Sequence, residues 1–146
     1  MIYRTLNPDD YEQLRTLWLS TPGMGLNTKD DSYEGISRFL MRNPDSCFAA
    51  VDNGQIVGVI MAGHDGRRGY IYHTAVRSDM RGHGIGRRLV ELALDALKQE
   101  GITKVALVVF SSNSGGNAFW QHMGFEGRDD LVYRNRALVK LLRVDT

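Results

Sequence analysis

The chain has 146 residues, of which 42% are hydrophobic, and its formal net charge is +1. This size and composition predict a single globular domain over residues 1–146, with enough apolar side chains for a core. The near-neutral charge argues against a general affinity for nucleic acid, and no apolar run approaches the ~20 residues that a membrane-spanning helix needs. We therefore expect no nucleic acid and no membrane among its partners.

The cysteine content and the first residues indicate the compartment. Cys47 is the single cysteine, which excludes an internal disulfide, and residues 1–10 carry charges and Pro8 where a signal peptide would be apolar. We therefore predict a cytoplasmic protein. Cys47 itself lies in an apolar run, and we interpret it as a buried small residue rather than a nucleophile.

The first part of the chain predicts a strand and two helices. Residues 2–5 suit a short strand, and Asn7 followed by Pro8 suits the N-cap and the first position of a helix. Residues 21–26 contain proline and glycine and end that helix in a loop. A second helix is expected to follow and to end before Pro44.

The middle of the chain predicts an antiparallel meander of three strands. Two apolar runs, residues 46–51 and 55–62, flank Asn53-Gly54, a strong signal for a two-residue hairpin turn. The third run, residues 70–76, is rich in aromatic and β-branched side chains, which favour an extended conformation.

The second half of the chain predicts one parallel unit. Apolar residues recur at helical spacing from residue 85 to residue 100, and Gly101 is placed to end that helix. Residues 103–110 form a continuous apolar run, as expected for a strand that is covered on both faces. This strand, the helix and the strand 70–76 then make a parallel strand–helix–strand unit. The remainder predicts a short helix and two further strands, over residues 117–123 and 127–144.

A basic, glycine-rich loop joins the strand 70–76 to the long helix. Its sequence is Arg81-Gly82-His83-Gly84-Ile85-Gly86. Glycines let the backbone approach a ligand, and the first N–H groups of a helix have no partners, so this helix start predicts a site for a phosphate-bearing cofactor. The loop lacks the Lys-Ser/Thr of a P-loop and the glycine spacing of a dinucleotide fingerprint. A tight strand-to-helix turn without a ligand is the alternative interpretation.

Two motifs carry a resemblance to a known family. The pattern Arg-x-x-Gly-x-Gly over residues 81–86 resembles the pyrophosphate-binding signature of the GNAT superfamily of acyl-CoA N-acyltransferases. A second family motif reads Asn, six residues, Tyr, three residues, Gly-Phe. Here Asn113, Gly124 and Phe125 stand in register, and Trp120 occupies the tyrosine position.

The resemblance implies a fold that agrees with the predicted elements. It is an α+β fold, also described as α/β, with a mixed but mostly antiparallel sheet of about six to seven strands, about four helices and one parallel strand–helix–strand unit. The resemblance covers the whole chain. Within the family, the sequence is similar to bacterial ribosomal-protein and small-amine acetyltransferases.

The resemblance also implies an activity, the transfer of an acetyl group from acetyl-CoA to a primary amine by direct attack in a ternary complex. The acceptor would be a small molecule or a peptide amine, such as a protein N-terminus or a lysine, and the expected partners include a second copy of the chain in a homodimer. The expected contacts to the pantetheine arm, the pyrophosphate and the rest of acetyl-CoA come from Thr74, Ala75, Val76, Arg81, Gly82, His83, Gly84, Ile85, Gly86, Arg87 and Asn113.

The catalytic residues are where the sequence departs from the family. The usual tyrosine protonates the departing thiolate, whereas an indole N–H donates a hydrogen bond but does not release its proton. Trp120 is then a packing aromatic, and the acid is either water or Tyr133, which alternatively is a half-buried strand residue. His73 has the ordinary pKa range of a general base, and its alternative role is that of a hydrogen-bonded core residue. These departures keep a second function open, that of a non-catalytic acyl-CoA-binding module.

The acceptor site is the least defined part of the sequence. In the fold that the resemblance implies, the first two helices and their loop form one wall of that site, with Trp18, Met24 and Leu26 as the expected contacts. Asp30 and Asp31 either attract a cationic amine or stabilise a helix N-terminus. The four histidines show no metal-ligand spacing, so no metal is predicted.

Overall fold

The computed structural model describes residues 1–145, which form four α-helices and seven strands. In chain order the elements are β1 (Ile2–Thr5), α1 (Tyr11–Leu19), α2 (Tyr33–Arg42), β2 (Phe48–Asp52), β3 (Gln55–Ile60), β4 (Ala62–His64), β5 (Gly69–Ile71), β6 (Ala75–Val76), α3 (Ile85–Gln99), β7 (Val105–Ala106) and α4 (Ser114–His122). Short 3-10 turns precede α1 and α3, at Pro8–Asp10 and Ser78–Met80. None of these helices is long and apolar enough to cross a membrane.

The start of the first helical segment follows the predicted local signals. The side chain of Asn7 accepts the N–H of Asp9 at 2.9 Å, and the carboxylate of Asp10 accepts the N–H of Asn7 at 3.0 Å. The same carboxylate binds the guanidinium of Arg4 through two hydrogen bonds of 2.8 Å. Asp10 is therefore both a helix cap and half of a partly buried ion pair.

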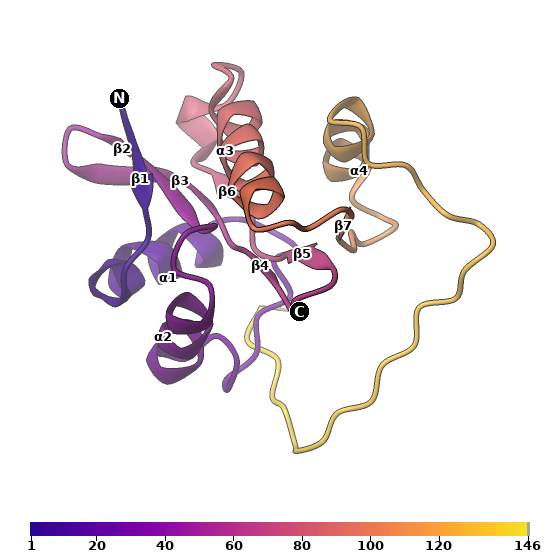
Figure 1. Ribbon diagram of the computed structural model, residues 1–146. Coiled ribbons are helices and arrows are strands. Elements are labelled where there is room, and N and C mark those ends of the chain that lie inside the picture. Colours follow the sequence, from indigo (N-terminus) through magenta and orange to yellow (C-terminus); the bar gives the residue numbers. More distant parts are fainter. Residues whose placement is uncertain (146) are drawn as a thin grey trace.

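The strands form two sheets, and two bent segments of the chain each contribute one strand to both sheets (Figure 1). The first sheet has the order β1-β2-β3-β6 and the second the order β4-β5-β7. Residues 55–64 pair antiparallel with residues 69–76. The first segment passes from one sheet to the other at Met61, and the second does so at residues 72–74. The predicted continuous strands 55–62 and 70–76 are thus each divided in two. β5 and β7 form the predicted parallel pair, which ends at Tyr70 and Ala106.

A β-bulge lies next to the start of α3. The register between β2 and β3 shifts after Ala50, so that Val57 is the extra residue on β3. The following residue, Gly58, pairs with Val76 of β6. A Cβ at Gly58 would lie 3.0 Å from the side chain of Ile85, so the absence of a side chain lets α3 pack directly on the strands.

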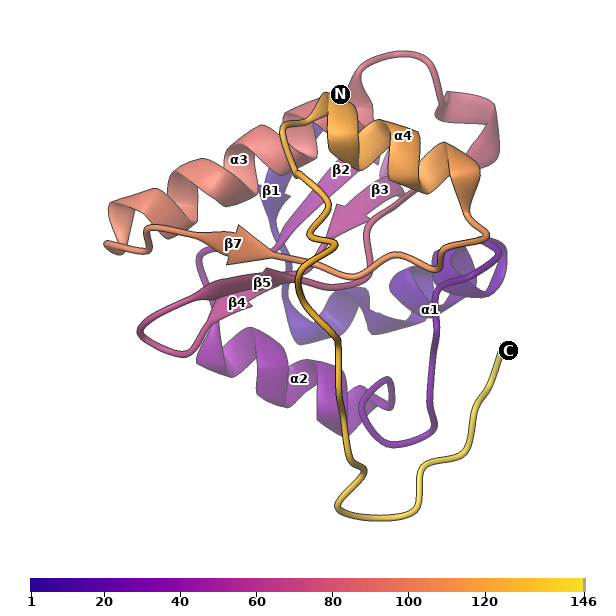
Figure 2. The ribbon, with the colours of Figure 1, turned by 90° about the vertical axis from the view of Figure 1, so that its right-hand side faces the viewer.

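Helices cover both faces of the strands, with α1 and α2 on one side and α3 and α4 on the other (Figure 2). Each side has its own apolar core. Leu14, Trp18 and Ile36 belong to the first core, and Leu89 and Leu97 belong to the second. The helices whose amphipathic patterns were predicted from the sequence therefore turn their apolar faces toward the strands.

The expectation for residues 103–110 was wrong in two respects, the length of the strand and the number of its faces that are covered. Only Val105 and Ala106 pair as a strand, and side chains from Val105 onward alternate between half-buried and exposed. Val105 and Leu107 pack against the core beneath α3, whereas Val108 is 58% exposed. One face of the segment is covered instead of two, because β7 separates from β5 after Ala106 and no layer covers its other side in residues 1–145.

The two strands expected within residues 127–144 are also absent from the described structure. This segment is an extended coil that leaves α4, swings out away from the strands and returns to the loop before α2 (Figure 1). The end of this segment contacts the loop before α2. There the N–H of Thr28 donates to the carbonyl of Leu142 at 2.9 Å, and Asn27 forms an isolated antiparallel β-bridge with Arg143. Strand propensity reflects the fit of side chains to a half-buried pleated surface, and no such surface lies beside this segment here.

Candidate functional site

The glycine loop leaves the first turn of α3 open. Gly84 is the N-cap of this helix, with φ of 80° and without a side-chain cap, and Gly82 has the same φ. The first helical bond runs from Arg88 N–H to the carbonyl of Gly84. The N–H groups of Ile85, Gly86 and Arg87 precede it and have no acceptor within the helix. A Cβ at Gly82 or Gly84 would meet open space, so no neighbouring group crowds the loop at these two positions, and a helix start with unpartnered amides favours an anion.

Basic side chains surround these amides. Arg81 donates from Nε to the carbonyl of Val76 at 3.0 Å, and Nδ1 of His83 lies 3.1 Å from the carbonyl of Met80. Arg87 lies 3.3 Å from Glu91, but both side chains are exposed, and such a pair contributes less than about 1 kcal/mol. Positive charge is therefore held close to the start of α3 by short contacts within the loop.

The strand that enters this loop has a free edge. β6 is the last strand of its sheet, and Arg77 donates its N–H to Val57 of β3. Because successive residues of a strand face opposite edges, the peptide groups of Val76 turn away from β3. The carbonyl of Val76 accordingly accepts a hydrogen bond from Nε of Arg81 instead of from β3. Thr74 lies just before the strand, with its hydroxyl on the carbonyl of Tyr72 at 3.0 Å. Beside this edge the parallel pair β5–β7 has already ended, so an extended ligand has room to add to the edge.

The second motif forms α4, which packs on the first turn of α3. The side-chain oxygen of Asn113 accepts the N–H of Gly116 at 2.9 Å and so caps α4. A Cβ at Gly86 would lie 3.3 Å from the ring of Phe119, which shows how closely the two helices approach. The residue of α4 that contacts the glycine loop is thus Phe119, whereas Asn113 lies at the start of α4, and the hydrogen bond that its side chain makes within residues 1–145 is the cap.

Trp120 packs within an aromatic cluster, as the sequence suggested. Its ring lies edge-to-face between Phe119, with centroids 5.0 Å apart, and Phe125, at 5.2 Å. The three rings pack against the core beneath α3. This arrangement accounts for an aromatic residue at position 120 without a chemical role.

Tyr133 does not lie in a strand. It is 65% exposed in the C-terminal coil, which corrects the expectation of a strand residue. Burial raises the pKa of Tyr70, and a smaller contribution from the nearby Tyr133 adds to that rise. The suggestion that Tyr133 is an acid stays a prediction.

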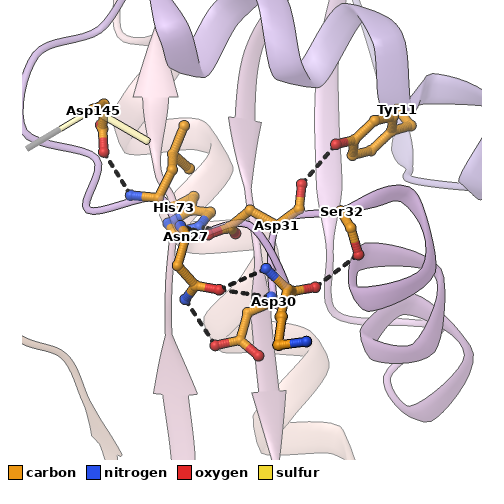
Figure 3. Close-up of polar contacts among 9 residues, drawn as sticks. Tyr11, Asn27, Asp30, Asp31, Ser32, His73 and Asp145 are labelled. Atoms are coloured by element: carbon orange, nitrogen blue, oxygen red, sulfur yellow. Dashed lines mark hydrogen bonds and ion pairs between the residues drawn. The ribbon is translucent and has the colours of Figure 1, made fainter. Parts of the chain in front are cut away.

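His73 lies on the other side of the strands, where it meets Asp31 (Figure 3). Nε2 of His73 is 2.5 Å from Oδ1 of Asp31, and the two side chains are only 13% and 8% exposed. The ring of His73 also packs edge-to-face on Trp18, with centroids 5.0 Å apart. Since Nε2 faces the carboxylate, the neutral ring carries its proton there and leaves Nδ1 as the lone-pair nitrogen.

Asp31 is held by a network that the sequence did not reveal (Figure 3). Its Oδ2 accepts the N–H of Asn27 at 2.8 Å, and its main-chain carbonyl accepts the hydroxyl of Tyr11 at 2.6 Å. Asn27 closes the loop further by accepting the N–H of Asp30 at 2.8 Å. Capping of α2 is left to Ser32, which accepts the N–H of Gly35 at 3.0 Å. Asp31 is therefore not the cap of α2, and its carboxylate is directed to His73.

Gly35 makes this position of Asp31 sterically possible. A Cβ at residue 35 would lie 2.3 Å from the carbonyl oxygen of Asp30 and 2.4 Å from that of Lys29. The first turn of α2 and the preceding loop are therefore in direct main-chain contact, which only a glycine permits.

A cavity of about 260 Å³ lies between α1 and the loop before α2. Trp18 and Leu26, two of the three expected acceptor contacts, line it, and Met24 instead packs against the core on the same side. The complete lining is Tyr11, Arg15, Trp18, Leu19, Leu26, Asn27, Thr28, Asp31, Ser32, Tyr33 and Val144. Arg15 and Tyr33 were not predicted, because nothing in the sequence relates them to the loop.

The remaining chemical candidates are placed by burial. Cys47 is 1% exposed, and burial raises the pKa of its thiol to about 12. The thiol therefore stays protonated, and it donates to the carbonyl of Ala62. It is thus a buried structural residue and not a nucleophile. Within residues 1–145 no three histidine, cysteine or acidic side chains gather as a metal site would require.

Comparisons with known proteins agree with this geometry. Residues 11–125 match the model of the acetyltransferase (GNAT) family. The chain is 31% identical to an acetyltransferase of Sodalis glossinidius over 140 residues, covering 96% of this chain and 97% of that one. It is 32% identical to an acetyltransferase of Pectobacterium atrosepticum over 138 residues, with 94% and 96% covered.

Solved structures show the same fold. The PaiA N-acetyltransferase of Thermoplasma acidophilum, determined in complex with coenzyme A, has a TM-score of 0.76 at 19% identity, covering 88% of this chain and 91% of that one. A ribosomal-protein-alanine N-acetyltransferase of Brucella melitensis has a TM-score of 0.70 at 21% identity, with 93% and 98% covered. The chain therefore belongs to the GNAT family of acetyltransferases, whose co-substrate is acetyl-CoA.

Proposed function

We propose that this acetyltransferase moves the acetyl group of acetyl-CoA to a primary amine by direct attack within a ternary complex. The free edge of β6 leading into the unpartnered amides of α3 is the observation that carries this proposal. An extended pantetheine arm would bind Thr74, Ala75 and Val76, and the diphosphate would bind the loop from Arg81 to Arg87. Asn113, the N-cap of α4, is the further cofactor contact that we propose.

His73 is the base that we propose for the reaction. An alkyl amine with a pKa of ~10.4 is protonated at neutral pH, and only its neutral form attacks a thioester. His73 directly precedes the residues proposed to bind the pantetheine arm, and Asp31 holds its Nε2, so Nδ1 is the nitrogen that would take the proton. The amine nitrogen bonds to the acetyl carbon and the carbon–sulfur bond breaks. The thiolate takes a proton from water, and the hydroxide left by that transfer takes the second proton of the former amine nitrogen.

The experiment compares the variant His73→Gln with the unchanged protein in a thiol-release assay with acetyl-CoA and a panel of amines. We expect kcat to fall about 100-fold, the lower range for a lost general base, while the affinity for coenzyme A stays within about twofold. Asp31→Asn should lower kcat in the same direction, because the amide no longer fixes the ring tautomer. A His73→Gln variant with unchanged kcat at neutral pH would rule out this role.

A non-catalytic acyl-CoA-binding module is the second candidate, favoured by Trp120 at the position where the family usually has tyrosine. The two functions differ in one measurement. A protein that binds coenzyme A but releases no thiol with any amine of the panel is the module, whereas amine-dependent release identifies the enzyme. A reducing cytoplasm is the compartment that we propose for either, because the single cysteine has no partner for a disulfide.

A further inference from the structure

The end of the described chain pairs with the loop before α2. We call residues 142–145 the C-terminal strap, because they lie antiparallel to residues 26–28 and hold them. The N–H of Leu26 donates to Oδ1 of Asp145 at 2.7 Å, and the carbonyl of Leu26 accepts the N–H of Val144 at 3.0 Å. Together with the hydrogen bond and the β-bridge described above, these contacts tie each residue of the loop segment to the strap.

The main chain of this loop depends on the strap for its hydrogen bonds. Residues 21–26 belong to no helix or strand, and Leu26 is 3% exposed, so neither regular structure nor bulk water satisfies the peptide groups of Leu26. A buried main-chain group without a partner destabilises a protein, which makes the pairing with the strap a condition of this loop conformation. Displacement of the strap would therefore let the loop move.

The same loop positions the carboxylate of Asp31 (Figure 3). The N–H of Asn27 donates to Oδ2 of Asp31 at 2.8 Å, and Oδ1 of Asp31 faces Nε2 of His73. Strap, loop, carboxylate and imidazole thus form a continuous series of contacts. The end of the chain accordingly borders the site of the base that we propose.

Val144 is the strap residue that lines the cavity between α1 and this loop. Trp18 and Leu26 of the same lining are 1% and 3% exposed and belong to the apolar core, so a change of size there would disturb the fold. Val144 is 43% exposed and is not among the residues of that core. The size of this side chain can therefore change the free space of the cavity with little loss of stability.

We infer that the C-terminal strap is a wall of the acceptor site and that Val144 limits the size of the amine that binds there. A cavity of about 260 Å³ leaves little room for a bulky acceptor. In an apolar pocket one methylene changes the discrimination between substrates about 10- to 200-fold, and the partial exposure of Val144 places this site at the lower end. The inference rests on the proposed function, because it assigns a specificity-determining residue to the acceptor site of that reaction.

The test changes the size of residue 144 and measures selectivity. The thiol-release assay compares phenethylamine with ethylamine as acceptors, and the ratio of their kcat/KM values is the readout. Val144→Ala should raise this ratio about 10-fold, because the larger amine gains space, and Val144→Phe should lower it about 10-fold. Val139→Ala and Val139→Phe are the matched controls, because Val139 is an exposed valine of the same coil outside the cavity lining. Both controls should keep the ratio of the unchanged protein.

A second pair of variants tests the attachment of the strap. Asp145→Ala removes the acceptor of the Leu26 N–H, whereas Asp145→Asn retains an oxygen for that hydrogen bond. We expect Asp145→Ala to raise the ratio in the same direction as Val144→Ala, and Asp145→Asn to keep the ratio of the unchanged protein. A loss of stability alone would lower the rates with both amines equally, and thermal unfolding of each variant measures that loss.

Three results would each overturn the inference: a ratio that does not respond to residue 144, the same response to residue 139, or an unchanged ratio in Asp145→Ala. Failure of the proposed function has a different signature, the absence of thiol release with every amine. In that case calorimetric binding of the two amines decides. An affinity ratio that follows the size of residue 144 supports the inference, and equal ratios or the absence of binding contradict it.

Discussion

A charge placed at Gly84 should weaken the binding of coenzyme A. Gly84 is the N-cap of α3, its φ is 80°, and a Cβ there meets nothing within 4 Å. Two substitutions of equal shape separate backbone strain from charge, namely Gly84→Gln and Gly84→Glu. Both place a non-glycine residue in the left-handed region, whereas only the second adds a negative charge beside the proposed diphosphate seat.

The expected magnitudes follow from this geometry. The left-handed backbone should lower the free energy of unfolding by about 1 kcal/mol for both variants. A unit charge about 4 Å from a phosphate charge costs ~1 kcal/mol in bulk water and ~4 kcal/mol near a protein surface, so we take about 2 kcal/mol as the penalty for this open site. A difference of about 2 kcal/mol weakens the affinity of the Glu variant about 30-fold relative to the Gln variant.

Isothermal titration with coenzyme A measures the difference, and pantetheine supplies the ligand control. Pantetheine lacks the diphosphate, so the Gln and Glu variants should bind it equally. Gly66→Glu is the protein control, because Gly66 has φ of 91° and open space around it but lies in the turn between β4 and β5. It should share the loss of stability and keep the affinity. Equal binding of coenzyme A by the two Gly84 variants would show that the diphosphate lies elsewhere.

Three further predictions concern stability, reactivity and the departure from the family motif. Burial alone would raise the pKa of Asp10, but its hydrogen bonds to Arg4 and to the Asn7 N–H outweigh burial and hold the pKa below its ordinary value. Its contribution to stability is therefore present above that ordinary value and lost as pH falls through the folded pKa; Asp10→Asn should lower the free energy of unfolding at pH 7 by about 1 kcal/mol, and denaturant titrations should show the difference vanish in acid. Cys47 should react with a thiol reagent at pH 8 only as the protein unfolds, and rapid labelling of the folded protein would contradict its burial. Trp120→Phe should keep thiol release within several-fold, since the ring packs without a chemical role, and a fall to background would give the indole a specific one.

The parts of the fold that were predicted from the sequence depend on local signals. Asn53 and Gly54 both adopt positive φ, as the two-residue hairpin requires, and Asn7 with Pro8 begins the first helical segment. The start of α3 at Gly84 was equally visible, because a glycine-rich loop between an apolar strand and an amphipathic helix has few other meanings. In each case the residues that determine the structure are neighbours in the sequence.

The parts that were not predicted depend on distant partners. His73 meets Asp31 across 42 positions of sequence, and no local pattern relates the two. The same reason explains the error at residues 127–144. Their propensity for strands was real, but a strand needs an edge to pair with and a surface to cover, and both are properties of the assembled fold.

Gly35 has a consequence for how this enzyme can change over evolutionary time. Alanine at an exposed helical position usually adds ~0.5–1 kcal/mol of stability over glycine, so drift toward a firmer α2 would be expected to replace it. The main-chain contact with residues 29 and 30 prevents that replacement without displacing the carboxylate on His73. Helix propensity at residue 35 is thus opposed by the position of a carboxylate two layers of contact away, on the imidazole that we propose as the base.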